Sequence, residues 1–158
     1  MKATDVKAYL TLLGELDETL DRLTEVEQAK TRAVQSDDLA GVNDCMNQEQ
    51  ALGLALRGFE QRRTAALAAL GLEGVPLRAL ADRLPAEHRP EARQAVGRLQ
   101  EGYRLYQAAA QVARNTLECN LHEIEKVLAD LGGERAPGPG YQREGPELPP
   151  AMHTDLRA

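Results

Sequence analysis

Residues 90–131 read PEARQAVGRLQEGYRLYQAAAQVARNTLECNLHEIEKVLADL, an unbroken amphipathic stretch that ends in Gly132-Gly133. Its apolar positions step alternately by three and four residues, which is the spacing of a seam between packed helices. At about 1.5 Å per residue, such a helix is roughly 60 Å long. This length predicts an elongated bundle that acts through its surfaces rather than a compact enzyme. The seam consists of Val96, Leu99, Tyr103, Tyr106, Ala110, Ala113 and Leu117.

The composition favours an all-α fold. The 158 residues are rich in Leu and Ala and include one Phe, one Ile and no Trp, so strong β-formers are scarce. The net charge is −6, and no dense Lys/Arg run provides the positive face that nucleic acid requires. The longest purely apolar run, residues 65–70, is far shorter than the ~20 residues that span a membrane. We therefore expect a cytoplasmic protein with no nucleic-acid partner and no stable membrane insertion.

Three further helices are predicted before the long one. The first runs from about residue 4 or 5 to residue 34, and Thr4 or Asp5 caps its start. Ser36-Asp37-Asp38 is a break with helix-capping chemistry, and a second helix follows over residues 39–70 and stops at Gly71. A short helix begins with Pro76 as its first residue and runs to residue 84. The expected architecture is an elongated antiparallel bundle or coiled coil of three long helices plus this short one.

Two charged residues interrupt the seam of the second helix. Glu49 must be paired or lie near the end of the bundle, because an unpaired buried carboxylate is costly. Arg63 can reach water past its own apolar stem.

The apolar surface of the final helix widens in its last three turns, beyond what one partner helix can bury. Two interpretations are open. Either the short helix over residues 76–84 covers the excess, or part of it forms an open docking groove. The widened surface consists of Leu121, Ile124, Val127, Leu128 and Leu131.

The composition changes at Gly133, which divides the chain into a helical domain, residues 1–132, and a flexible Pro/Gly-rich tail, residues 133–158. Five of the eight prolines fall in this tail, and it has no helical period. Tyr141 is its only aromatic residue. It is either inert or the centre of a short linear motif that a partner captures.

No catalytic or metal-binding pattern stands out, and we expect neither an enzyme nor a cofactor. Cys119 and His122 are neighbours on one helix and could bind zinc with Cys45, but only with a fourth ligand and one particular helix register. The simpler expectation is that Cys45 and Cys119 are free thiols, buried as small apolar side chains.

The order of these elements resembles the FlgN family of flagellar export chaperones. The resemblance rests on the regularly spaced Leu residues, on Arg62-Arg63, on the helix end over residues 128–133 and on the Tyr-x-x-x-Gly pattern of residues 141–145. It covers essentially the whole chain. Asn115 lies in the middle of the last helix without the Gly that family members often carry beside it.

This resemblance implies a cytosolic chaperone that binds the C-terminal segments of hook–filament junction proteins. It implies that the chaperone prevents their premature assembly and delivers them to the export gate, whose cytoplasmic domain contacts Tyr141. An apolar groove can order a cargo segment by helix-in-groove packing, and the candidate cargo-binding residues are Leu117, Leu121, Ile124 and Leu128. We expect a monomer or weak dimer.

Three alternatives stay open at this point. The chain could be a helical scaffold that self-assembles through the same seam, or a chaperone for another flagellar cargo such as the filament cap or flagellin. It could also be a metal-binding four-helix protein.

Overall fold

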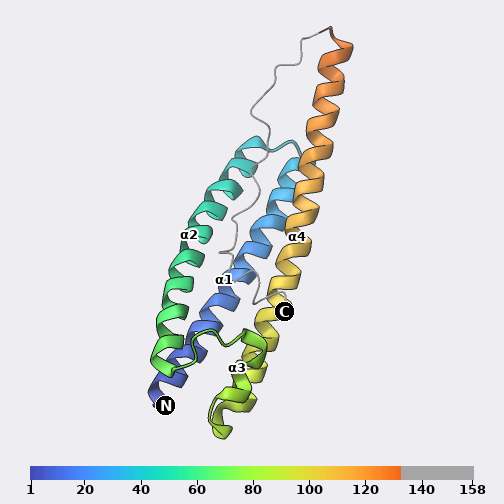
Figure 1. Cartoon of the computed structure of the whole chain (residues 1–158). Helices are drawn as coiled ribbons and strands as arrows, with labels where there is room; N and C mark the ends of the chain where they lie inside the picture. Colours follow the sequence, from blue (N-terminus) through green and yellow to red (C-terminus); the bar gives the residue numbers. More distant parts are fainter. Residues whose placement is uncertain (133–158) are drawn as a thin grey trace.

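The computed structural model describes residues 1–132, and every regular element in this range is helical (Figure 1). The elements are α1 (Ala3–Gln35), α2 (Leu39–Leu70), α3 (Leu77–Arg83), a 3-10 turn η1 (Ala86–His88) and α4 (Arg89–Asp130). α1 is the central helix, because it packs against both α2 and α4. α2 runs antiparallel to α1 and α4, and α3 lies at the end of the rod where α2 finishes (Figure 1). The predicted all-α elongated bundle is confirmed.

The ends of α2 follow from local chemistry and match the prediction. The Asp38 carboxylate accepts a hydrogen bond from the Gly41 N–H at 3.0 Å, which satisfies one of the donors left open at a helix start. At the other end, Gly71 takes a left-handed conformation with φ 69°, which a Cβ would disfavour. Its N–H bonds back to the carbonyls of the last turn.

Two predicted helix starts are wrong. α1 begins with Lys2 in the cap position and no side-chain cap, so neither Thr4 nor Asp5 has this role. Because this end of the rod is exposed, water can satisfy its open N–H groups. Pro76 precedes α3 as its cap residue, in an extended conformation, rather than being its first helical residue.

A single hydrophobic core joins the four helices. α1 contributes most of it, and α2, α3 and α4 each add leucines that are almost fully buried. Fully burying one such side chain stabilises the fold by about 1.5–3 kcal/mol. The most deeply buried leucines are Leu13, Leu16, Leu20, Leu23, Leu56, Leu80, Leu84 and Leu99.

The position of α3 decides between the two interpretations of the widened apolar surface. α3 packs against α4 near the start of α4, whereas the widened surface lies at the far end of α4 (Figure 1). The linker from Gly71 to Pro76 has six residues and spans at most about 20 Å. α3 therefore cannot reach the last turns of α4, and the prediction that it covers them is wrong.

Candidate docking groove

The last turns of α4 extend beyond the turn that joins α1 to α2 (Figure 1). α4 has 42 residues and α1 has 33, which correspond to about 63 Å and about 50 Å of helix. Beyond the end of α1, the apolar side chains of α4 have no described partner helix. Ile124 is 50% exposed, Leu128 46% and Leu131 78%.

A groove of about 260 Å³ lies where α4 passes the α1–α2 turn. One wall comes from α4, and the other comes from the end of α1, the turn itself and the start of α2. Most of the lining is apolar, which suits the apolar face of a helix or an extended segment. The lining residues are Ala33, Val34, Asp37, Asp38, Leu39, Val42, Leu117, Asn120, Leu121 and Ile124.

Three of the four candidate cargo-binding residues, Leu117, Leu121 and Ile124, line this groove together. Leu128 follows Ile124 by one turn on the same face and lies outside the lining. Tyr141, the candidate contact for the export gate, lies outside the described residues.

The wall opposite α4 was not identified from the sequence. Val34 lies near the end of α1, and Leu39 and Val42 lie at the start of α2, so they face α4 only through the way the helices pack. The sequence feature that could have indicated this wall is the large apolar residue Leu39, which directly follows the capping Asp38. At 78% exposure, Leu39 packs on nothing substantial in residues 1–132.

A close approach within the α1–α2 turn shapes this wall. Asp37 has a φ of 56°, a left-handed conformation that Asp tolerates better than most residues. A Cβ added to Gly41 would lie 2.3 Å from Asp38 Oδ2 and 3.3 Å from the Ala33 Cβ. Gly41 therefore lets the capping carboxylate fold over the helix start, which holds Leu39 and Val42 beside the end of α1.

A buried ion cluster lies one turn below the groove. Lys30 Nζ donates to Glu27 Oε2 at 3.0 Å and also donates to Glu49 Oε1 across the α1–α2 interface. All three side chains are almost fully buried. The expectation that Glu49 is paired is confirmed, and Lys30 is its partner.

The cluster holds two carboxyl groups against one ammonium. Burial and a hydrogen bond to the Glu49 carboxyl raise the pKa of Glu27 to about 7, while Lys30 opposes this shift. Burial alone would lower the pKa of Lys30, but its contacts with Glu49 and Glu27 give a net rise. Tyr106 of α4 faces the cluster, and burial, with the two carboxylates, raises the pKa of its phenol. The Lys30–Glu49 contact thus links α1 to α2 one turn from the groove.

The two cysteines have different environments. Cys45 is buried as expected, and burial, followed by the Glu49 carboxylate, raises the pKa of its thiol. Cys119 is exposed on α4, so the expectation that it is buried is wrong.

Residues 1–132 bring together no group of three or more Cys, His, Asp or Glu side chains suited to a metal ion. Within the same range, no helix combines the length and apolarity needed to cross a membrane.

A family model described as FlgN protein matches residues 1–148. The chain belongs to the FlgN family. The matched range includes the whole helical rod and the segment from Tyr141 to Gly145, which confirms the resemblance read from the sequence. No curated protein and no solved structure matches the chain. FlgN proteins are flagellar export chaperones that bind flagellar substrate proteins, so this chain belongs to flagellum biogenesis and type III secretion.

Proposed function

We propose that this chain is a cytosolic chaperone that holds the C-terminal segments of hook–filament junction proteins in the groove between α4 and the α1–α2 turn. The observation that carries the proposal is the apolar stripe of α4, which continues past its partner helices with Leu121 and Ile124 in the groove. Leu128 prolongs the stripe by one turn and is 46% exposed.

The physical basis is helix-in-groove packing. An amphipathic cargo segment would bury its apolar face against α4 and against Val34, Leu39 and Val42. Ordering a disordered segment costs several kcal/mol, so a net affinity between ~1 μM and ~10 nM is expected. A segment held in this way cannot pack into an assembling filament, and its release requires no chemistry in the chaperone.

The test is calorimetric titration with the C-terminal segments of the two junction proteins, with the C-terminus of flagellin for comparison. Replacing Leu121 and Leu128 by Asp should abolish binding and leave the helical content near that of wild type. The matched control replaces Cys119 and Ala129 by Asp, because both residues are exposed and lie on other faces of the same turns. If the Leu121/Leu128 variant still binds, the cargo site lies elsewhere.

Cargo identity is tested in the same titrations. Tight binding of the flagellin segment alone would favour a chaperone for another flagellar cargo. Absence of binding together with a concentration-dependent dimer would favour the self-assembling scaffold over the monomer or weak dimer that we propose.

We propose that Tyr141 contacts the cytoplasmic domain of the export gate. The support is the Tyr-x-x-x-Gly pattern, which lies within the part of the chain that the family model matches. Tyr141→Ala should weaken binding to the gate domain and leave cargo binding unchanged. Tyr141→Phe separates the contribution of the ring from that of the hydroxyl. Equal gate affinity for Tyr141→Ala and wild type would refute this role.

A further inference from the structure

The charge around the groove indicates which kind of segment it can hold. Two of the lining residues, Asp37 and Asp38, are acidic, and none of the lining residues in the described part of the chain is basic. The surrounding stretches, residues 35–48 and 112–132, contain seven acidic side chains and only two basic ones. An apolar groove with an acidic rim therefore lies at this end of the rod.

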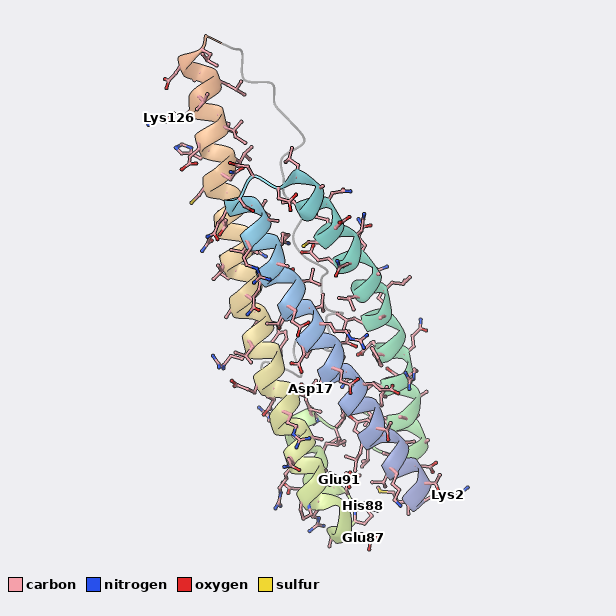
Figure 2. The ribbon with its side chains drawn as sticks, turned by 180° about the vertical axis from the view of Figure 1, so that it is seen from behind. Lys2, Asp17, Glu87, His88, Glu91 and Lys126 are labelled. Carbon is pink, nitrogen blue, oxygen red and sulfur yellow. The ribbon has the colours of Figure 1, made fainter. Side chains whose placement is uncertain are left out.

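Helix geometry places more of this charge beside the groove. Glu118 and Glu125 lie three residues before and four residues after Leu121, so they flank its side of α4. Lys126 is the only Lys or Arg after Arg114 in α4. Figure 2 shows that Lys126 points outward from α4, away from α1 and α2. The nearby cation is therefore not placed to neutralise the rim.

The opposite end of the rod has the reverse balance. Residues 76–104, which form α3 and the first turns of α4, contain six arginines and four acidic residues. The groove end of the rod is thus net negative and the opposite end is net positive, while residues 15–27 of α1 hold a further six acidic side chains and one basic side chain. Concentrated charge around a binding site steers association and selects partners of complementary charge.

We infer that the groove selects an amphipathic segment whose apolar face is flanked by Lys or Arg, with Asp37 and Glu125 as specificity-determining residues. The inference rests on the proposed function in treating the groove as the cargo site. The apolar contacts with Leu121 and Ile124 supply most of the affinity, and the acidic rim discriminates between segments with similar apolar faces.

The experiment uses two synthetic peptides with the same amphipathic apolar face, one flanked by Lys and Arg and the other by Glu. Their affinities for the full chain are measured by fluorescence anisotropy at about 50 mM and about 500 mM salt, since salt screens exposed charges. The basic peptide should bind at least roughly tenfold more tightly than the acidic one at low salt, and the ratio should shrink at high salt.

A pair of variants locates the effect. Asp37→Asn with Glu125→Gln removes two charges from the rim, and Asn also tolerates the left-handed backbone at position 37. Glu87→Gln with Glu91→Gln removes two charges at the opposite end of the rod, where Figure 2 labels both residues. The rim variant should bind the basic peptide roughly five- to tenfold more weakly at low salt, and the control variant should bind like wild type.

The outcomes separate this inference from the proposed function. If the junction segments bind tightly but neither salt nor the rim variant changes their affinity, the inference is overturned and the cargo proposal stands. If no junction segment binds but the basic peptide does, and the rim variant weakens it, the cargo identity fails and the groove chemistry stands. A concentration-dependent dimer that excludes both peptides would make a second copy the occupant and would also overturn the inference.

Discussion

Both halves of α4 have an apolar stripe, but only the stripe of the first half is buried. From Ala92 to Ala113 the stripe is buried, and Leu99 is 1% exposed. From Ile124 onward its apolar side chains are about half exposed or more. Because both halves have an apolar stripe, and the stripe is wider in the second half, the difference in burial arises from the partner helices. α1 and α3 cover the first half, whereas no described helix reaches the end of the second. Exposed apolar patches are typical of protein–protein interaction sites, which supports the proposal that this end of α4 holds cargo.

The largest expected effect is on the free energy of unfolding, and it is tested with one substitution in each half of α4. Leu99→Ala should lower the free energy of unfolding by about 2–5 kcal/mol, because it leaves a cavity in the core. Leu128→Ala removes the same atoms from an exposed position and should change it by no more than about 0.5 kcal/mol. Urea denaturation measures both. Similar losses for the two variants would mean that another part of the chain packs on Leu128.

The second-largest effect is on the pH dependence of the free energy of unfolding. It comes from the ion cluster, which lies near the junction of the two halves of α4. The pKa of Glu27 is raised from 4.5 to about 7 in the folded state. Below about pH 4.5, Glu27 is protonated in both the folded and unfolded states. As the pH rises from about 4.5 to about 7, the unfolded state gives up this proton before the folded state does, so the wild type loses on the order of 3 kcal/mol of stability from this group. Glu27→Gln removes this loss, so its stability relative to wild type should increase between pH 4.5 and pH 8.

Urea denaturation at several pH values measures the difference. Glu25→Gln, at an exposed site on the same helix, is the control and should keep the pH dependence of wild type. A Glu27→Gln variant with the same pH dependence as wild type would show that Glu27 titrates normally in the folded protein.

The sequence determined the individual helices better than their mutual arrangement. α2 was predicted from end to end because Asp38 and Gly71 act locally. The start of α1 was misplaced, since an exposed helix end needs no side-chain cap. The partner of Glu49 could not be named, because Lys30 reaches it only in one register of α1 against α2.

The same division applies to the candidate site. The α4 wall follows from the heptad spacing of Leu117, Leu121 and Ile124. The opposite wall depends on how far α1 extends along α4, which no local pattern encodes. Arg63 was expected to reach water, but its side chain is only 8% exposed and donates to Glu60 at 3.2 Å. Its environment is likewise set by packing rather than by its position in the stripe.

The third effect compares the two thiols. Cys119 is exposed, whereas Cys45 is buried and has a raised pKa, so less of it is present as the reactive thiolate. Ellman's reagent at pH 8 should modify Cys119 at least roughly tenfold faster than Cys45. Cys119→Ser should remove the fast phase, and Cys45→Ser the slow one. Equal rates would mean that the α1–α2 interface opens readily around Cys45.

The smallest effect distinguishes the outer and inner faces of the covered half of α4. Gly97 is exposed, and a Cβ added there meets no atom within 4 Å. Gly97→Ala should therefore raise the free energy of unfolding by about 0.5–1 kcal/mol through helix propensity alone. Gly102 faces α1, and its added Cβ would lie 2.7 Å from Asp17 Oδ1. That carboxylate, labelled in Figure 2, must move to make room, so Gly102→Ala should gain less than Gly97→Ala in urea denaturation at pH 7. An equal gain would mean that Asp17 shifts at no cost and that α1 and α4 do not depend on glycine for their close approach.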